Sequence, residues 1–282
     1  MRALLAQLDP EPGALAENAA QAAAAIREHP EVDLAVFPEL FLSGYRLEDM
    51  EAVACEVDGL ELGVIATACA AAGTAAIVGF VERDGTKFRN AAACFDSAGE
   101  HVATYRKSQL FGAEADAFAP GECLLVVELA GRSVAPLICF DIEFPELARA
   151  AAVAGADLLV TVAANMEPFK REHLIHTTAR ALENRVPHLY VNRVGHESGF
   201  DFVGGSRAID SDGVVLVEAD GPGPQLFEAE VGAQGTADDR VDYLAFEPSR
   251  PRVTVQAKSW VRGPAGGEGS HLAPQATNHQ SA

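Results

Sequence analysis

The chain has 282 residues, of which 49% are hydrophobic and 22% are charged. This composition is ordinary for a globular protein with a sizeable core, and the length allows one large domain or two small ones. The 21 Lys and Arg against 41 Asp and Glu give a formal net charge of −20, which argues against nucleic acid and anionic membranes as partners. No apolar run reaches the roughly 20 residues of a membrane-spanning helix.

The N-terminal segment and the cysteines bear on the cellular compartment. Residues 1–8 hold one cation and an apolar stretch too short for a signal peptide, and Asp9-Pro10 ends it. We therefore expect a strand at residues 2–8 and a cytoplasmic protein. The cysteines are odd in number and contain no C-x-x-C pair, which argues against a disulfide framework and a structural zinc site. They are Cys55, Cys69, Cys94, Cys123 and Cys139, and burial of all five thiols is the ordinary expectation.

Helices and strands alternate through the first quarter of the chain. The sequence predicts an alanine-rich helix over 13–27, a short apolar strand over 33–37, and a helix over 59–72 that ends at Gly73. From residue 75 the pattern changes to strands and tight turns, with hairpin signals at Asp84-Gly85 and Ala98-Gly99. The expected strands there are 75–82, 90–96, 102–106, 124–129 and 134–138.

The second half returns to alternating helices and strands. Pro145 opens a helix that stops at Gly155, because proline is favoured in the first turn. The mixture of β-α-β units and hairpins predicts an α/β protein with one mixed sheet or two sheets covered by helices. The remaining expected elements are a strand over 157–163, a helix over 171–184, a strand over 188–192 and strands around Asp212-Gly213.

No repeat and no linker divides the chain before its C-terminal end. From Gly263 onward the sequence is rich in glycine and poor in bulky apolar residues, which is typical of a segment without a packed core. We expect one domain over residues 1–255. We expect the extension over 256–282 to be partly disordered or docked on a partner subunit.

Three segments place a reactive side chain just past the end of an apolar strand, where active sites of α/β proteins gather. Glu39 follows the strand that ends at Phe37-Pro38, Lys107 follows the strand 102–106, and Cys139 lies between a strand and the next helix. Each residue alone has an ordinary structural explanation: a paired carboxylate, an exposed turn or a small buried thiol. The combination is more informative than its parts.

Together the three residues suit nucleophilic catalysis. A thiol with a pKa near ~8.5 needs a base or a nearby cation to become a nucleophile. Glu39 can accept the thiol proton, and Lys107 and the N–H of Phe140 can stabilise negative charge on a substrate oxygen. Attack on a C–N carbon gives a thioester; Glu39 passes the proton to the leaving ammonia, and water completes the hydrolysis.

The order and spacing of these motifs resemble those of the nitrilase, or carbon–nitrogen hydrolase, superfamily. The resemblance runs from residue 2 to about residue 255 and is carried by the segments at 37–39, 105–114, 138–146, 163–166, 179–185, 190–195 and 242–244. It implies a four-layer αββα sandwich and a triad of Glu39, Lys107 and Cys139. Glu114 matches a second glutamate that positions the substrate and the lysine. The resemblance also implies no metal or organic cofactor and a homodimer or larger assembly.

The nucleophile motif indicates a branch of that superfamily. True nitrilases typically carry Cys-Trp-Glu, whereas this chain has Cys139-Phe140-Asp141. Residues 138–146, followed by Ala-Asn-Met at 164–166, resemble the small aliphatic amidases, including those for ω-amino amides. We expect an amidase acting on small aliphatic primary amides. The alternatives are an N-carbamoyl amidohydrolase, in which Lys170 or Arg171 binds a substrate carboxylate, and, less favoured, a nitrilase.

Five further residues are expected around the substrate. Asn165 and Met166 follow a strand end at the same edge, and Phe140 follows the nucleophile. Tyr45 matches a loop that flanks the pocket in the superfamily. Glu143 can contact a substrate amine or Lys107, but it is equally well explained as a structural carboxylate at a helix start.

Two competing interpretations remain. In a papain-type hydrolase a histidine downstream of Cys139 would be the base, oriented by Asn192. This requires Glu39 and Lys107 to be incidental, and we expect the two histidines on the 171–184 helix to be exposed and to lack a third ligand for a metal. The second interpretation is a non-enzymatic scaffold, which three reactive residues at strand ends argue against. The candidate histidines downstream of Cys139 are His173 and His176, on the predicted helix, and His188.

Overall fold

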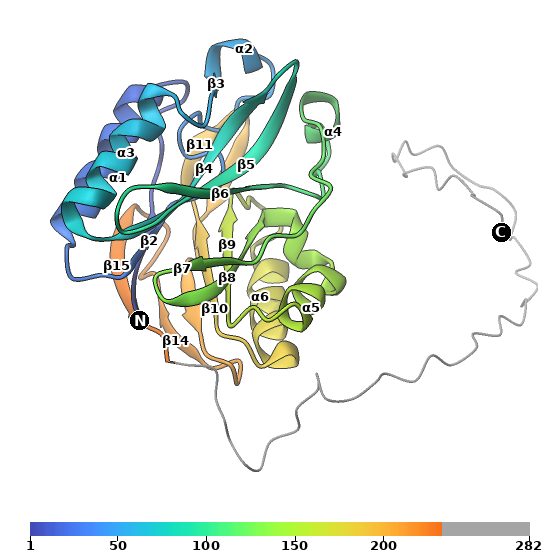
Figure 1. The fold of residues 1–282 in the computed structure, drawn as a ribbon. Helices are drawn as coiled ribbons and strands as arrows, with labels where there is room; N and C mark the ends of the chain where they lie inside the picture. The colour runs from blue at the N-terminus through green and yellow to red at the C-terminus, as the bar shows by residue number, and fades with distance from the viewer. Residues whose placement is uncertain (233–282) are drawn as a thin grey trace, which may run out of the picture. The chain divides into compact units, whose positions relative to one another are not determined.

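The computed structural model describes residues 1–232 of the chain, and within them the fold is built on two large sheets (Figure 1). The first has the strand order β15-β1-β2-β4-β5-β6, with β3 beside β4. Its strands are β1 (Arg2–Gln7), β2 (Leu34–Val36), β3 (Ala54–Cys55), β4 (Ala75–Asp84), β5 (Lys87–Phe95), β6 (His101–Arg106) and β15 (Gln225–Glu230).

The second sheet has the order β14-β13-β10-β9-β8-β7, and a separate hairpin pairs β11 with β12. Both large sheets are mixed: β1-β2-β4 and β8-β9-β10 are parallel, whereas the outer pairs are antiparallel. The strands are β7 (Val127–Leu129), β8 (Arg132–Ile138), β9 (Leu158–Ala163), β10 (His188–Asn192), β11 (Val194–Glu197), β12 (Phe200–Val203), β13 (Arg207–Ile209) and β14 (Val215–Glu218).

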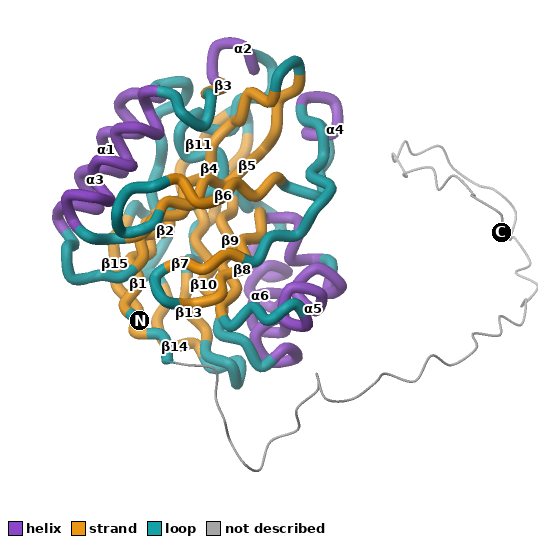
Figure 2. The backbone as a smooth tube through the Cα atoms, in the orientation of Figure 1, coloured by secondary structure: helices purple, strands orange, loops and turns teal. Residues whose placement is uncertain are grey.

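Helices cover the outer faces of both sheets, in two groups on opposite sides of the strands (Figure 2). Alternate residues of β1 show why: Leu4 packs with the α1 and α3 side, whereas Leu5 packs in the cluster between the sheets. The predicted αββα sandwich is confirmed. The helices are α1 (Leu15–Glu28), α2 (Met50–Val53), α3 (Leu60–Ala72), α4 (Glu114–Ala117), the 3-10 helix η1 (Cys139–Glu143), α5 (Pro145–Val153) and α6 (Lys170–Asn184).

Local sequence explains several of these boundaries. α3 ends where Gly73 takes φ 73°, a conformation that glycine adopts without strain. α5 has Pro145 in its first turn, where a missing N–H costs nothing. Both predicted hairpins form, β4-β5 around Gly85 and β5-β6 around Gly99. No helix in residues 1–232 is long and apolar enough to cross a membrane.

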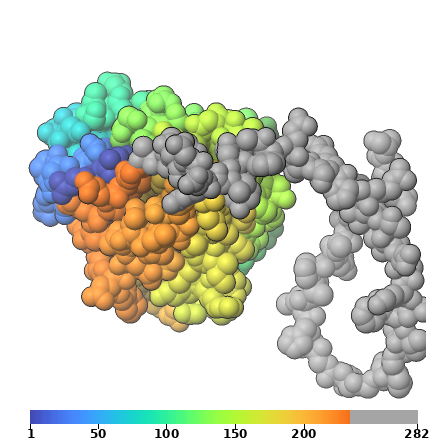
Figure 3. Space-filling model, turned by 90° about the horizontal axis from the view of Figure 1, so that it is seen from below, coloured from blue at the N-terminus to red at the C-terminus, as the bar shows by residue number. Residues whose placement is uncertain are grey.

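The first and last described strands lie together. β1 pairs antiparallel with β15 along its whole length, from Arg2 opposite Glu230 to Gln7 opposite Gln225. Figure 3 shows the chain's beginning, in blue, beside the end of the described part, in orange. This edge strand was not predicted, nor was the β11–β12 hairpin, and the strand predicted over 124–129 is only Val127–Leu129. The predicted boundary at 255 and the extension over 256–282 lie outside the described residues.

Candidate active site

Glu39 lies in the loop after β2, and this loop approaches β4 closely. A Cβ on Gly79 would lie 2.2 Å from the carbonyl oxygen of Pro38 and 2.7 Å from Cα of Glu39, far inside any contact distance. The next residue, Leu40, has φ 50°, in the sparsely populated left-handed region. The turn that carries Glu39 therefore depends on the missing side chain of Gly79.

Both carboxylate oxygens of Glu39 are held by hydrogen bonds. Oε1 accepts from Nδ2 of Asn90 and from Nζ of Lys107, each at 2.7 Å. Oε2 accepts from the backbone N–H of Ala164 at 2.7 Å, which links the first sheet to the end of β9 in the second. Glu39 is 1% exposed, so its charge is stabilised by these donors rather than by solvent.

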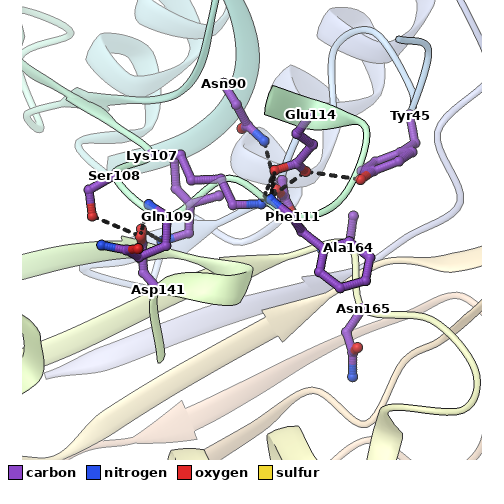
Figure 4. A network of polar contacts seen from close by, with 12 residues as sticks. Tyr45, Asn90, Lys107, Ser108, Gln109, Phe111, Glu114, Asp141, Ala164 and Asn165 are labelled. Carbon is purple, nitrogen blue, oxygen red and sulfur yellow. Dashed lines mark hydrogen bonds and ion pairs between the residues drawn. The ribbon is translucent and has the colours of Figure 1, made fainter. Parts of the chain in front are cut away.

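Lys107 lies between two carboxylates. Its Nζ is 2.7 Å from Oε1 of Glu39 and 2.8 Å from Oε2 of Glu114, and all three side chains are buried. Figure 4 shows the amine directed at Glu114, with Asn90 and Tyr45 on either side. Burial on its own lowers the pKa of Lys107, but attraction by Glu114 and Glu39 outweighs it and holds the pKa well above its ordinary value.

Glu114 opens the short helix α4, and Tyr45 reaches it from another loop. Oε1 of Glu114 accepts from the Tyr45 hydroxyl at 2.9 Å, and Oε2 accepts from the backbone N–H of Phe111 at 2.9 Å. Burial raises the pKa of Glu114, and attraction by Lys107 opposes the shift. The structure places Glu114 at a helix start, with its side chain against Lys107.

Cys139 begins η1, directly after β8. It has φ 45°, so the chain turns sharply there, as expected for a strand–turn–helix elbow. The thiol is buried, with the residue 8% exposed. Burial, followed by the charge of Glu39, raises the pKa of Cys139 well above its ordinary value, although Lys107 lowers it. A base must therefore remove the proton when the thiol attacks.

Asp141 ties this elbow to the end of β6. Its Oδ2 accepts from the N–H of Ile138 at 3.0 Å and from the Tyr105 hydroxyl at 2.9 Å. Its Oδ1 accepts from the Ser108 hydroxyl and the Gln109 N–H, at 3.0 and 2.9 Å. Four donors on one buried carboxylate fix the segment that carries Cys139 relative to the segment that carries Lys107.

A buried ion pair supports the loop of Tyr45. Arg193 lies 2.5 Å from Oε2 of Glu197, and the same oxygen accepts from the Tyr45 N–H at 2.9 Å. A Cβ on Gly44 would lie 2.7 Å from Oε1 of Glu197, so this loop fits only because residue 44 is glycine. The β11–β12 hairpin thus holds Tyr45 in place against Glu114.

A small cavity of about 20 Å³ opens beside Cys139. Its apolar wall is formed by Phe111, Phe140, Met166, Phe169 and Ala164, and its polar wall by Asn165, Glu143 and His173. The rings of Phe111 and Phe140 are 5.4 Å apart, and those of Phe111 and Phe169 are 5.7 Å apart, both edge to face. A polar centre and an apolar pocket therefore meet at the thiol.

Comparison with known proteins identifies the family. The family model described as carbon–nitrogen hydrolase matches residues 2–240. The chain belongs to the carbon–nitrogen hydrolase family. A Pseudomonas protegens protein described as "Hydrolase in pqqF 5'region" is 40% identical over 219 residues, 76% of each chain. An (R)-stereoselective amidase from a Pseudomonas species is 37% identical over 191 residues, 67% of this chain and 69% of the relative.

Solved structures agree with this assignment. An amidase of the nitrilase superfamily from Nesterenkonia AN1 superimposes with a TM-score of 0.76 and 30% identity, covering 86% of this chain and 92% of that one. A variant of that amidase shows covalent addition of the acetamide moiety of fluoroacetamide at its active-site cysteine. These matches confirm the prediction of an amidase of the nitrilase superfamily.

Most predicted site residues of this carbon–nitrogen hydrolase lie together, with three corrections. His173 was expected to be exposed but is 2% exposed, because the α6 face that contains it packs on β10 and η1. Glu143 contacts His173, at 3.4 Å from Nε2, whereas Lys107 is bound by Glu39 and Glu114. Burial of all cysteine thiols was the ordinary expectation, yet Cys123 is exposed. The buried α6 face comprises His173, Thr177, Arg180, Ala181 and Asn184.

Sequence reasoning missed Asn90, Gly79, Phe111 and Phe169. Asn90 was expected merely to begin a strand, and only the fold shows that its amide meets Glu39. The stripe of the buried α6 face, at positions i, i+4, i+7, i+8 and i+11, was a sequence signal that could have found His173. In residues 1–232, no group of three or more His, Cys, Asp or Glu is arranged to hold a metal ion.

Proposed function

We propose that this chain hydrolyses small aliphatic primary amides to a carboxylic acid and ammonia through a thioester on Cys139. The observation that carries the proposal is the position of Glu39. Its carboxylate bonds Lys107 on one side and the Ala164 N–H on the other, and Ala164 lines the cavity together with Cys139. A base, a cation and a thiol thus meet at one end of the two sheets.

The first half of the reaction forms the thioester. Glu39 takes the thiol proton as Sγ of Cys139 attacks the amide carbon, and the carbonyl electron pair moves onto oxygen. Nζ of Lys107 and the N–H of Phe140 stabilise this oxyanion. The carboxylic acid of Glu39 then protonates the leaving nitrogen, the C–N bond breaks, and ammonia departs.

The second half hydrolyses the thioester. Glu39, again a carboxylate, accepts a proton from water as the water oxygen attacks the thioester carbon. Collapse of this second tetrahedral intermediate breaks the C–S bond and returns the proton from Glu39 to sulfur. Glu114 and Tyr45 act by holding Lys107 in place, which fits their contacts of 2.9 Å.

The cavity favours small acyl groups. Its volume of about 20 Å³ is on the scale of a single water molecule, which disfavours bulky acyl groups. The Nesterenkonia amidase supports this size class, because a double mutant of it was solved in complex with acrylamide. The (R)-stereoselective relative suggests that chiral amides should be tested as separate enantiomers. A homodimer or larger assembly and a cytoplasmic location remain predictions from the sequence.

Two of the enzymatic alternatives, the N-carbamoyl amidohydrolase and the cysteine–histidine hydrolase, fit the contacts less well. Neither Lys170 nor Arg171 is among the residues that line the cavity, so the expected partner for an N-carbamoyl substrate's carboxylate is missing there. Nδ1 of His173 contacts the Tyr190 hydroxyl at 3.1 Å and Nε2 contacts Glu143. Because both ring nitrogens are occupied, His173 is a poor candidate for the base of a cysteine–histidine hydrolase.

The test is ammonia release from acetamide, propionamide, an N-carbamoyl amino acid and a simple nitrile. We expect turnover of the amides, its loss in Cys139→Ala, and its retention in the control Cys123→Ala, which changes an exposed thiol. Main turnover of the carbamoyl compound or the nitrile would show that the substrate class is wrong. A larger loss for His173→Ala than for Glu39→Gln would favour the cysteine–histidine mechanism.

A further inference from the structure

The main-chain N–H of Ala164 faces both the carboxylate of Glu39 and the thiol of Cys139. It donates to Oε2 of Glu39 at 2.7 Å, and Ala164 and Cys139 line the same cavity. β8 and β9 run parallel, with Ile138 opposite Val162. Cys139 and Ala164 follow these two residues, so they meet at the same end of the sheet. One N–H therefore serves both groups between which the thiol proton must move.

The thiol itself depends on this N–H. Burial, and after it the charge of Glu39, raises the pKa of Cys139 well above its ordinary value, whereas Lys107 and a hydrogen bond from the Ala164 N–H lower it. A donor that binds the thiolate favours the charged nucleophile over the neutral thiol. Because Ala164 is 1% exposed, this hydrogen bond forms away from solvent, where it is stronger.

The two oxygens of Glu39 differ in their capacity to accept a proton. Each carboxylate oxygen accepts about two hydrogen bonds. Oε1 already accepts two, from Asn90 and Lys107, whereas Oε2 accepts one within residues 1–232, from Ala164. Oε2 is therefore the oxygen that can take the thiol proton. The acceptor beside the Ala164 N–H then becomes neutral at the moment when sulfur becomes negative.

We propose that the N–H of Ala164 is a catalytic donor that passes from Glu39 to Cys139 during this proton transfer. The S–H bond breaks, its electron pair stays on sulfur, and an O–H bond forms at Oε2. The N–H keeps its own proton and binds the thiolate in place of the carboxylate. The inference rests on the proposed function, because it assumes that Cys139 is the nucleophile and Glu39 the base.

The side chain of Asn192 directs this N–H. In a strand, the N–H and C=O of one residue point to one side, and those of the next residue point to the other. At the end of β10, Oδ1 of Asn192 accepts from the Asn165 N–H at 2.7 Å, and Nδ2 donates to the Asn165 carbonyl at 3.1 Å. Both groups of Asn165 thus face β10, so the N–H of Ala164 must point the other way, to β8 and Cys139.

Asn192 is itself held by hydrogen bonds and is 0% exposed. Its Nδ2 also donates to the Gly204 carbonyl, and its main-chain N–H donates to Oγ of Ser206, each at 2.9 Å. The ladder between β9 and β10 ends with Ala163 opposite Asn192, and the amide side chain continues it by one residue. Asn192 is not among the residues that line the cavity. It is therefore a positioning residue for the Ala164 N–H.

The test measures the reactivity of the thiol without an amide substrate. Methyl methanethiosulfonate, a small reagent with no carbonyl group, transfers a methylthio group to a thiolate and releases methanesulfinate. Mass spectrometry follows the labelling rate of Cys139 and, in the same sample, that of the exposed Cys123. Asn192→Ala should slow labelling of Cys139 about tenfold to a hundredfold and leave Cys123 unchanged. We expect kcat/KM on acetamide to fall by at least the same factor.

Thr161→Val is the matched control, because it removes a buried hydrogen bond, to His188, from the same strand. It should lower the melting temperature and leave both rates at their wild-type values. If Asn192→Ala does not fold, lactic acid incorporated at position 164 replaces the N–H of Ala164 by an ester oxygen, and the same slowing is expected. Labelling of Cys139 at the wild-type rate or faster, in either folded enzyme, would overturn the proposal even if amide turnover fell.

The proposal and the proposed function fail in different ways. Slower labelling of Cys139 in Asn192→Ala with undiminished turnover of acetamide would overturn the catalytic role of the Ala164 N–H alone. If wild type releases no ammonia from any amide, or Cys139→Ala equals wild type, the proposed function has failed. The labelling rates still decide whether the Ala164 N–H stabilises the thiolate, because they involve no amide.

Discussion

The polar centre and the cavity wall are built in different ways. Glu39, Lys107 and Glu114 are buried near strand ends, and every carboxylate oxygen among them accepts at least one hydrogen bond. The wall is carried by η1, α6 and the loops around them, and its rings contact one another through edges rather than hydrogen bonds. The first region is fixed by directional contacts, whereas the rings of the second are held by packing.

This difference separates chemistry from selectivity. Hydrogen bonds that span both sheets fix Glu39 and Lys107 within a narrow geometry, as the proposed reaction through charged intermediates requires. Packing contacts tolerate replacement by groups of similar volume. Substitutions in the polar centre should therefore lower the rate on all substrates, whereas substitutions in the cavity wall should change which amide has the highest kcat/KM.

The largest expected effect is that of Glu39→Gln. The amide cannot accept the thiol proton, so kcat/KM should fall by roughly a hundredfold to ten-thousandfold on every amide. Steady-state kinetics measures the loss, and circular dichroism checks the fold. Glu48→Gln, a change in an exposed residue of a nearby loop, is the control. A substrate-dependent loss would mean that Glu39 belongs to the wall rather than to the centre.

A buried histidine outside both regions should affect stability rather than catalysis. Burial lowers the pKa of His188 from 6.5 to about 4, and its nitrogens contact Thr161 and the Thr177 carbonyl. Between pH 4 and 6.5 the unfolded chain binds the extra proton, so the free energy of unfolding should rise with pH, by up to about 3 kcal/mol over that window.

Urea titrations at several pH values measure this dependence. His188→Asn should flatten it, whereas the exposed control His196→Asn should leave it as in wild type. An equal slope in wild type and His188→Asn would contradict the assignment. The pH profile of kcat/KM should be the same in both, because the histidine has no contact with the polar centre.

Gly79→Ala tests the backbone that positions Glu39. The added Cβ meets Pro38 and Glu39 at 2.2 and 2.7 Å, so the loop must move, at a cost of about 1–3 kcal/mol. We expect a lower melting temperature and a loss of activity on all amides. Gly63→Ala, in helix α3 with no atom within 4 Å of the new Cβ, should gain roughly 0.5–1 kcal/mol. Full activity of Gly79→Ala would contradict this account of the turn.

The smallest effect is expected for Tyr45→Phe. It removes one hydrogen bond to Glu114 and leaves Lys107 its two carboxylates, so kcat should fall by up to about tenfold. The loss should be similar for short and long amides, which a panel of kcat values would reveal. If the substitution instead changed the ranking of the amides by kcat, Tyr45 would belong to the cavity wall.

The sequence was sufficient for most strands of the two large sheets and for the three reactive residues at strand ends, for an identifiable reason. Glu39, Lys107 and Cys139 follow apolar strands, and strand ends converge at one edge of a sheet. Asn90 and Gly79 were not predicted, because their roles depend on which strands become neighbours. The contact between Gly79 and the Glu39 loop links residues 40 positions apart, and no local pattern marks it.

The wall was predicted in part. Phe140, Asn165 and Met166 lie next to strand ends and do line the cavity. Phe111 and Phe169 come from loops whose paths are set by tertiary packing. No periodic pattern of apolar residues in the sequence therefore indicates that these two rings meet. His173 was placed on the wrong side of its helix because its polarity was weighed above the stripe it shares with Ala181. For polar residues on a buried helix face, the residue type alone gives the wrong expectation of solvent exposure.

The central claim is that Cys139 is the nucleophile, and labelling with fluoroacetamide tests it most directly. The enzyme is incubated with the reagent, and residual amidase activity is compared with the acetamide content of each cysteine-containing peptide by mass spectrometry. We predict that activity falls in proportion to labelling of Cys139 and that the exposed Cys123 can be labelled without loss. Full activity with Cys139 labelled, or undiminished turnover in Cys139→Ala, would contradict the account.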